Sequence, residues 1–415
     1  MILLVYRISL WIYEILAICA MPIYPKARKW VSGRKNWRKQ LSTWGGKKTI
    51  WMHCSSLGEF EQGRPLLDAI AKEYPDRDIL LSFFSPSGYE IRKNYGNATK
   101  VVYLPIDSPD NAKTFIELIN PKLVIFVKYD LWYYYLKTLH KKNIPTFLIS
   151  ASFSSHQKYF KFPFQGFYKK IFSYFTGIFT QHEESHEFLQ NKLKEITSVW
   201  KAGDTRFDRV IEQVRHPAPL KPLDIFLSEH DCIIAGSTWP ADDRLLIEAI
   251  NKLKDHRIKW IIAPHELNPK TFEMYKKKLK NRMILYSELN ALHPGVQVLL
   301  IDNIGLLSTI YKLGDIAYIG GGISKRIHNI QEPAAYGLPL LFGPRYNDFR
   351  EAIDLIEQQG AYVVDSSDQL EKRILQILPA TELRHKIFQT NQHYIQLKSG
   401  ATRQILNILQ TGKWI

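Results

Sequence analysis

Glu59 is a candidate general base because of the segment in which it stands. An apolar run of strand character at Thr49–His53 leads into a small-residue turn, Cys54-Ser55-Ser56, and a helical pattern covers Arg64–Glu73. A strand–turn–helix of this kind places backbone N–H groups and the positive end of a helix at the C-terminal edge of a sheet. Glu59 is then either a base that faces a cleft or a charge that stabilises the helix start.

A second candidate site is the run Gly320-Gly321-Gly322, which follows the apolar residues Ile316–Ile319. Glycines without a Cβ let backbone N–H groups approach a phosphate closely. We expect a helix to begin near Asn329, with Glu332 in its first turn, where a carboxylate can accept both hydroxyls of a ribose. Alternatively Asn329 caps this helix and Glu332 completes a capping box, and both interpretations can hold together. The spacing is not that of a GxGxxG dinucleotide fingerprint.

Two doubly wound α/β domains are needed to position these residues. Short apolar runs alternate with helical stretches such as Arg64–Glu73 and Ala112–Ile119, which is typical of parallel sheets covered by helices. The expected buried strands are Thr49–His53, Ile79–Phe83, Lys100–Leu104, Leu123–Val127, Thr146–Ile149 and Gly177–Thr180, then Cys232–Ala235, Trp260–Ala263, Val298–Ile301, Ile316–Ile319 and Pro339–Phe342.

The proline-rich, aperiodic segment Arg215–Leu223 is the expected linker between the two domains. We therefore divide the chain into five parts: a membrane-associated segment at 1–25, a basic segment at 26–48, a first Rossmann-like domain at 49–214, a second, nucleotide-binding one at 224–382, and a helix at 383–415 that crosses back to brace the first.

The N-terminus predicts contact with a membrane. Residues 1–23 are apolar and nearly of spanning length, but Arg7 and Glu14 interrupt them. Either the segment is a signal-anchor helix or it is an amphipathic helix that lies in the interface. The basic segment that follows, in a chain of net charge +16, favours an anionic membrane surface on the cytoplasmic side. No nucleic-acid-binding motif is recognised, so nucleic acid is not an expected partner.

The three cysteines lie far apart, and no cluster has metal-ligand spacing. This argues against a disulfide scaffold or a zinc site and fits a reducing compartment.

Several segments resemble the Kdo transferases, which move 3-deoxy-D-manno-octulosonic acid (Kdo) from CMP-Kdo onto a lipid A precursor. His53-Cys54-Ser55-Ser56-Leu57-Gly58-Glu59 is similar to the family's His-Ala-Ala-Ser-Val-Gly-Glu, and the segment at 320–334 to its Gly-Gly-His-Asn-Pro-Leu-Glu-Pro-Ala. Further similar segments, Gly203–Asp208, Ala235–Thr238, Asp302–Leu307 and Gly343–Phe349, follow in the family's order, so the resemblance runs from about residue 49 to 405.

The resemblance implies a GT-B fold of two Rossmann-like domains and metal-independent, inverting transfer without a cofactor. It implies that Glu59 is the base, with Asp130 and Arg206 as further catalytic residues. The acceptor side would carry Ser55, Ser56 and Gly58. The donor CMP-Kdo would contact Gly236, Ser237, Thr238, Pro264, His265, Ile304, Gly305, Leu306, Gly321, Gly322, Asn329, Ile330, Gln331 and Glu332.

Three positions depart from the family pattern. His265 stands where arginine is common, so a fixed positive charge at the CMP phosphate is missing there. Lys128 replaces the first carboxylate of Met-Glu-Thr-Glu-Leu-Trp, leaving Asp130 as its only acid, and Ser152 replaces another arginine. Because Glu59, Asn329 and Glu332 remain, these changes indicate a divergent branch of the family.

The leading functional hypothesis is therefore transfer of Kdo to lipid IVA at the cytoplasmic face of the inner membrane, in lipopolysaccharide biosynthesis. One alternative is another nucleotide-sugar enzyme of the same architecture, an epimerase or hydrolase, in which a membrane anchor would be unexpected. The other is a non-catalytic peripheral membrane protein, which would leave both glycine-rich turns and Glu332 without a role.

Overall fold

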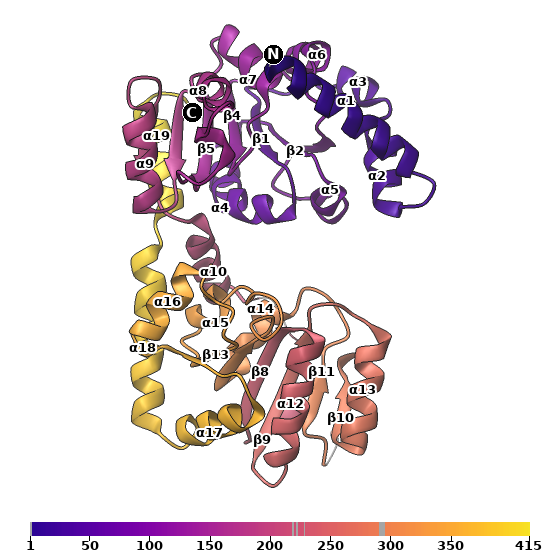
Figure 1. Cartoon of the computed structure of the whole chain (residues 1–415), viewed down its shortest axis with the longest axis vertical. Helices are drawn as coiled ribbons and strands as arrows, with labels where there is room; N and C mark the ends of the chain where they lie inside the picture. The colour runs from indigo at the N-terminus through magenta and orange to yellow at the C-terminus, as the bar shows by residue number, and fades with distance from the viewer. Residues whose placement is uncertain (1, 218–219, 221–222, 228, 290–294) are drawn as a thin grey trace. The chain divides into compact units, whose positions relative to one another are not determined.

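The computed structural model describes residues 2–217, 220, 223–227, 229–289 and 295–415. These residues form two compact units, one of Met1–Arg209 with Ser399–Ile415 and one of Val210–Lys398. Each unit contains a seven-stranded parallel sheet covered by helices (Figure 1). The predicted fold class, α/β with two Rossmann-like units, an apolar N-terminal helix and a C-terminal bracing helix, is confirmed. The predicted linker lies partly outside the described residues.

The sheet of the first unit has the strand order β3-β2-β1-β4-β5-β6-β7. The order reverses between β1 and β4, and the loops after these two strands therefore meet at the carboxyl edge, where ligands of open α/β sheets bind. The strands are β1 Ile50–Cys54, β2 Ile79–Phe83, β3 Lys100–Tyr103, β4 Leu123–Val127, β5 Thr146–Ala151, β6 Gly177–Thr180 and β7 Ser198–Lys201.

The helix that carries Glu59, α4, begins at Leu57, seven residues before the predicted start. Pro65 lies inside it, and Gly63 packs where a Cβ would lie 3.0 Å from Met52 and Val127. Proline and glycine normally weaken a helical pattern, which is why the first turns were missed. The other helices of this unit are α1 Ile2–Ala20, α2 Pro25–Arg34, α3 Trp37–Ser42, α5 Pro86–Arg92, α6 Pro109–Ile119, α7 Tyr133–Lys141, α8 Gln165–Phe172, α9 Glu183–Leu193, the start of α10 Thr205–Arg215, and α19 Ala401–Thr411.

The second unit repeats this plan with the strand order β10-β11-β9-β8-β12-β13-β14, which reverses between β8 and β12. Its strands are β8 Asp231–Thr238, β9 Ile258–Pro264, β10 Met283–Leu285, β11 Val298–Leu300, β12 Ile316–Ile319, β13 Leu340–Phe342 and β14 Ala361–Val363. Its helices are α11 Asp224–Leu227, α12 Pro240–Lys252, α13 Pro269–Leu279, α14 Leu307–Ile310, α15 Gln331–Ala335, α16 Arg350–Glu357, α17 Ser367–Ile377 and α18 Thr381–Lys398.

The sequence pattern missed three strands, β7, β10 and β14, all at sheet edges. Each has only three or four residues, and their side chains are partly exposed at one or more positions. A short, half-exposed edge strand lacks the continuous apolar run that reveals a buried one.

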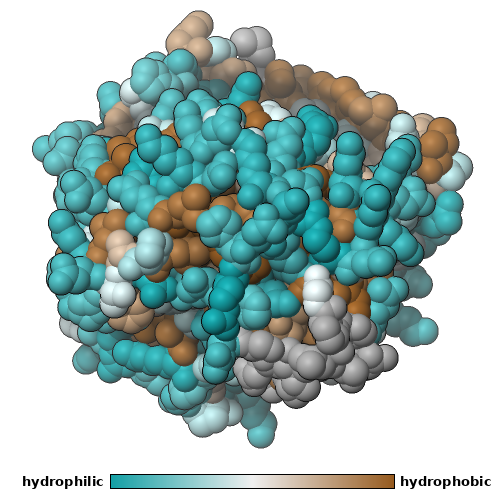
Figure 2. Space-filling model, turned by 90° about the horizontal axis from the view of Figure 1, so that it is seen from below, coloured by the Kyte–Doolittle hydropathy of each residue, from teal (hydrophilic) through white to brown (hydrophobic). Residues whose placement is uncertain are grey.

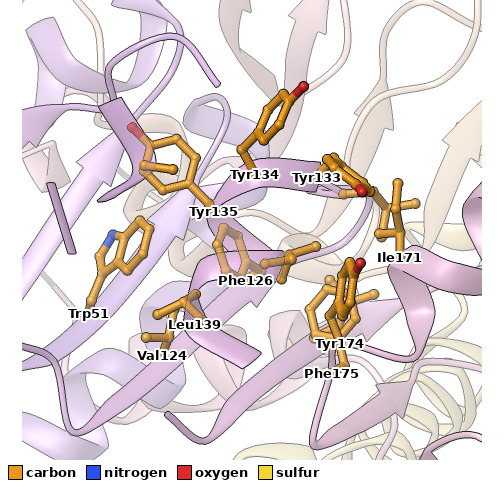
Figure 3. Packing of buried hydrophobic residues seen from close by; sticks show 14 of the residues in the cluster. Trp51, Val124, Phe126, Tyr133, Tyr134, Tyr135, Leu139, Ile171, Tyr174 and Phe175 are labelled. Atoms are coloured by element: carbon orange, nitrogen blue, oxygen red, sulfur yellow. The ribbon is translucent and has the colours of Figure 1, made fainter. Parts of the chain in front are cut away.

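Successive side chains of β1 point to opposite faces of the first sheet and so join two hydrophobic clusters. Trp51 packs with Phe126 and Tyr135 on one face, while Met52 and Cys54 lie in the cluster on the other. Figure 3 shows the aromatic face, where three consecutive tyrosines of α7, Tyr133–Tyr135, spread over the sheet. The surface seen in Figure 2 is by contrast mainly hydrophilic, with smaller apolar patches between the polar residues.

Two helices stand where one was predicted at 383–415: α18 belongs to the second unit, and α19 belongs to the first. Ile405, Leu406 and Leu409 are buried in the cluster on the second face of the sheet. The backbone N–H groups of Gly400 and Thr402 donate to the carboxylate of Asp208, which holds the start of α19 against α10.

The N-terminal helix α1 is attached along one side to the first unit. Tyr6 packs against Tyr133 and Phe167, and its hydroxyl donates to Asp107 Oδ2 at 2.6 Å. The Tyr13 ring packs on Trp30 in a T-shaped arrangement and on Phe84 in a tilted one. The opposite side of α1 is apolar and exposed, including Leu4, Trp11 and Leu16. Among the described residues, α1 is the one helix long and apolar enough to cross a membrane.

The basic segment that follows α1 is folded as α2 and α3 and packs on the first unit. Arg34 donates to the carbonyls of Leu104 and Phe84 at 2.9 and 2.6 Å, and burial lowers its pKa to about 9. Its charge therefore serves the fold, whereas Lys26, Lys35 and Lys39 remain exposed.

We predict that Tyr6→Phe loosens α1. The buried Asp107 also accepts the backbone N–H groups of Tyr134 and Tyr135, and burial raises its pKa to about 6. Loss of a hydrogen bond to such a group should lower the free energy of unfolding by about 1.5–3 kcal/mol. Amide exchange in residues 2–20 should rise as well. Tyr13→Phe makes the same change on the same helix, and equal effects of the two would contradict the prediction.

Candidate functional site

Glu59 lies in the first turn of α4, immediately after the loop at the carboxyl end of β1. Ser56 is the N-cap residue, and its hydroxyl donates to Glu59 Oε2 instead of accepting a helix N–H. The carboxylate is thus oriented by a side chain of its own turn. Gly58 next to it is exposed, and a Cβ there would meet only Ser56 Oγ, at 3.7 Å. The turn is therefore uncrowded at Gly58, the residue next to Glu59.

Asp130, in the loop after β4, holds the turn after β1. It is 5% exposed and accepts the Ser55 backbone N–H at 3.2 Å through Oδ2 and the Ser55 hydroxyl through Oδ1. Burial and the nearby Glu59 raise the pKa of Asp130. The predicted residues Ser55, Ser56, Gly58, Glu59 and Asp130 thus converge where the strand order of the first sheet reverses.

His53 links the core of this sheet to Asp130. Ser82 Oγ accepts the indole N–H of Trp51 at 2.7 Å and lies 2.8 Å from His53 Nδ1. The other ring nitrogen of His53, Nε2, lies 3.8 Å from Asp130 Oδ2. Complete burial lowers the pKa of His53 to about 3, so the ring is neutral at pH 7.

Two cations stand at the same edge of the first sheet. Arg206, at the start of α10, makes a bidentate ion pair with the buried Asp204, with Nε–Oδ1 3.1 Å and Nη2–Oδ2 2.6 Å. Burial alone would raise the pKa of Asp204, but Arg206 outweighs it and lowers the pKa. Burial also lowers the pKa of Lys128, which lies within electrostatic range of both Arg206 and Glu59. Lys128, noted from the sequence only as a departure, therefore lies within electrostatic range of the candidate base.

In the second unit, the glycines at the end of β12 pack against backbone. A Cβ on Gly320 would lie 2.3 Å from Ser237 O, and one on Gly322 2.6 Å from Gly343 N. The N–H of Gly320 donates to Gly236 O, and that of Gly321 to the buried carboxylate of Asp242. These two N–H groups are therefore engaged within the protein, and donor contact at Gly321 stays a prediction.

An aromatic cluster that the sequence did not reveal lies beside these glycines. The rings of Trp239, His265 and His328 stack, with His265 4.6 Å from Trp239 and 4.3 Å from His328 between ring centroids. Lys325 Nζ lies 3.1 Å from the centroid of the Trp239 ring. Burial, His265 and Lys325 lower the pKa of His328 to about 4, and burial and Lys325 lower that of His265. Lys325 thus supplies a fixed positive charge beside His265, where the family pattern has arginine.

The helix with Glu332, α15, begins at Gln331, two residues later than predicted. Asn329 Oδ1 accepts the Gln331 N–H at 3.0 Å, so Asn329 does satisfy the helix start, although Ile330 is the N-cap residue. Glu332 is half-buried in the first turn and lies near the hydroxyls of Tyr311 and Tyr336, whose pKa values rise through burial and its charge.

The remaining predicted donor residues converge on the same edge of the second sheet. His265, after Pro264, donates its backbone N–H to Thr238 O at 2.9 Å. A Cβ on Gly236 would lie 3.0 Å from Leu307, which follows Leu306. Ile304 is 89% exposed, and Gly305 has a φ of 100° that favours glycine. Among the described residues, no group of three or more His, Cys, Asp or Glu could hold a metal ion.

Comparison with solved structures defines the class of fold. The UDP-GlcNAc 2-epimerase from Neisseria meningitidis, solved with UDP-GlcNAc bound, has a similar fold with a TM-score of 0.62 over 88% of this chain and 100% of that one, at 15% identity. The chain thus has the fold of two-unit Rossmann-like proteins.

Comparison of sequences gives the family. Residues 32–209 match the family model described as 3-deoxy-D-manno-octulosonic-acid transferase (kdotransferase). The chain is 27% identical over 378 residues to the 3-deoxy-D-manno-octulosonic acid transferase of Haemophilus influenzae, with 87% of this chain and 86% of that one covered. It is 25% identical to that of Chlamydia pneumoniae, with 96% and 95% covered. The resemblance noted in the sequence is thereby confirmed: the first part of the chain matches the model of the Kdo transferase family, and most of the chain is similar to Kdo transferases.

We predict that His53 makes the stability of the first unit depend on pH. The unfolded chain binds a proton on this histidine below about pH 6.5, whereas the folded chain binds it only near pH 3. The free energy of unfolding should therefore decrease as the pH falls from 6.5 towards 3. At pH 5 the decrease should be roughly 2 kcal/mol.

Glutamine at position 53 cannot titrate, so the His53→Gln protein should not lose this stability. The difference in unfolding free energy between wild type and His53→Gln, measured by urea denaturation, should therefore shrink by roughly 2 kcal/mol between pH 7 and pH 5. His156→Gln, at an exposed position of the same unit, should keep the wild-type slope. Parallel pH profiles for all three proteins would rule the prediction out.

Proposed function

We propose that the protein transfers Kdo from CMP-Kdo to a lipid A precursor, lipid IVA, with inversion at the anomeric carbon. The observation that carries the proposal is the geometry around Glu59: a carboxylate oriented by Ser56, on an uncrowded turn, with Lys128 and Arg206 at the same edge of the sheet. Similarity to the Kdo transferases supplies the substrate class.

In the proposed reaction, a hydroxyl oxygen of the acceptor attacks the anomeric carbon of Kdo, and Glu59 accepts the proton of that hydroxyl. The bond from this carbon to the phosphate oxygen breaks, and its electron pair leaves with CMP. Arg206 stabilises negative charge that develops in the transition state. Asp130 keeps the Ser55 turn in place, so that Glu59 meets the acceptor in a fixed orientation.

The donor is assigned to the carboxyl edge of the second sheet. Glu332 would accept the ribose hydroxyls of CMP, and Lys325 with the exposed His265 would face its phosphate. The N–H groups of Gly320 and Gly321 are engaged within the protein, so charged side chains have to meet more of the phosphate charge here.

We further propose that the protein works at the cytoplasmic face of the inner membrane, with α1 lying along the membrane surface. The contacts of Tyr6 and Tyr13 hold one side of α1 on the first unit and leave its other side apolar and exposed. A helix attached along its length in this way is better suited to an interfacial position than to crossing the bilayer.

The base is tested by Glu59→Gln, which keeps the shape of the side chain but cannot accept a proton at neutral pH. Transfer measured as CMP release should fall by about 10²–10⁴-fold, the usual contribution of a general base. Calorimetric affinity for CMP-Kdo should stay the same. Glu187→Gln makes the same change at an exposed position of the first unit and should leave turnover intact. Near-normal turnover of Glu59→Gln would return Glu59 to a charge that stabilises the helix start.

Glu332→Ala tests the donor site. Loss of hydrogen bonds from two ribose hydroxyls to a carboxylate should weaken CMP and CMP-Kdo together by about 10–100-fold. Glu357→Ala, an exposed carboxylate at the end of α16 in the same unit, is the matched control. If a folded Glu332→Ala protein bound CMP as tightly as the wild type, the residue would serve only the start of α15.

A further inference from the structure

A pocket of about 480 Å³ lies between α1, α2 and the loop from β2 to α5. Apolar and aromatic side chains from all three elements line it, with Leu16 and Ala17 from α1, Trp30 from α2 and Phe84 from the loop. Lys26 also lines it; this residue is exposed and makes no ion pair with any described residue. The pocket therefore combines an apolar interior with one uncommitted cation.

The pocket is continuous with the exposed apolar side of α1. Tyr13 and Leu16 line the pocket and are 46% and 61% exposed, and Trp11 on the same helix is 63% exposed. A contiguous exposed apolar surface of this kind marks contact with a membrane or another protein. An occupant of the pocket would therefore pass directly into the apolar environment that α1 itself favours.

The other wall of the pocket, the loop from β2 to α5, contacts the turn that leads to the candidate base. The backbone N–H of Ser85, a lining residue, donates to Ser55 O at 2.7 Å. Phe84, the residue before it, packs on Trp132 with 4.8 Å between ring centroids. Trp132 follows Asp130 by two residues, and Asp130 binds Ser55. One backbone hydrogen bond thus separates the pocket wall from the turn that leads to Glu59.

We propose that this pocket binds one acyl chain of the acceptor lipid, with Lys26 beside a phosphate or ester of its head group. The inference rests on the proposed function, because it deepens the acceptor assignment of the same turn. A chain that leaves the bilayer for the pocket exchanges one apolar environment for another, so it gains little from hydrophobic burial. What the pocket supplies is position: it fixes the sugar head of the lipid relative to the Ser55–Glu59 turn.

The proposal is tested by filling the pocket with Ala17→Trp. Two acceptors are compared, the acylated glucosamine disaccharide bisphosphate and the same disaccharide without acyl chains, with CMP-Kdo as donor. Transfer to the acylated acceptor should fall by roughly ten- to a hundred-fold, because its head group is no longer positioned. Transfer to the acyl-free acceptor should match the wild type. Ile12→Trp, at an exposed position of α1 outside the pocket, should change neither rate.

Equal losses with both acceptors would overturn the proposal, because they would mean that the substitution disturbs the candidate site itself. Reduced sedimentation of Ala17→Trp with phosphatidylglycerol vesicles, at unchanged acceptor preference, would also overturn it and give the pocket to bulk phospholipid. If the wild type transferred Kdo to neither acceptor, the proposed function would fail separately.

A second measurement does not depend on turnover or on the folding of a variant. The wild-type protein is irradiated with an acylated acceptor that carries a diazirine at the end of one chain, and the labelled peptides are identified. Labels within 13–30 and 84–86 support the pocket. Labels confined to other peptides of the first unit overturn it.

Discussion

A buried aspartate ties together two loops at the point where each sheet reverses its strand order. In the first unit, Asp130 from the loop after β4 binds the backbone N–H and hydroxyl of Ser55 after β1. In the second, Asp242 of α12 accepts the N–H of Gly321 after β12 and that of Trp239 after β8, and the hydroxyl of Tyr318. A buried carboxylate is costly unless it is hydrogen-bonded, so each arrangement fixes its loops strongly. The loop that leads to Glu59 and the loops with predicted donor residues are held in position by these two carboxylates.

Much of the fold was readable from the sequence because buried parallel strands are short apolar runs. Ile79–Phe83, Leu123–Val127, Gly177–Thr180 and Ile316–Ile319 have the predicted bounds. The edge strands β7, β10 and β14 were not predicted, since their few side chains do not form such a run. The start of α4 was missed for another reason, because its helix is stabilised by packing that compensates Gly63 and Pro65. Tertiary contact, which is not visible in a local pattern, decided these cases.

The candidate sites were predictable only where one short segment carries the chemistry. Glu59 and Glu332 each follow a recognisable turn, whereas the stack of Trp239, His265 and His328 joins residues from three separate loops. The same holds for Ser82, whose hydroxyl connects Trp51 and His53 across neighbouring strands. His265 illustrates the limit well. When the sequence is compared with the family pattern position by position, His265 is the loss of an arginine charge. In the folded unit, Lys325 supplies a positive charge nearby.

The net charge of +16 is a poorer guide to membrane attraction than the sequence suggests, because part of the basic segment serves the fold. Arg34 is held by backbone carbonyls and by the ring of Trp30, and Lys29 and Lys48 pair with carboxylates. Attraction to an anionic surface then depends on fewer cations, such as Lys26, each contributing about 1 kcal/mol near the surface. The exposed apolar side of α1 must supply the rest, and this contribution, unlike ionic attraction, does not weaken with salt. Apolar contact rather than charge would therefore set how firmly the first unit is held at a membrane.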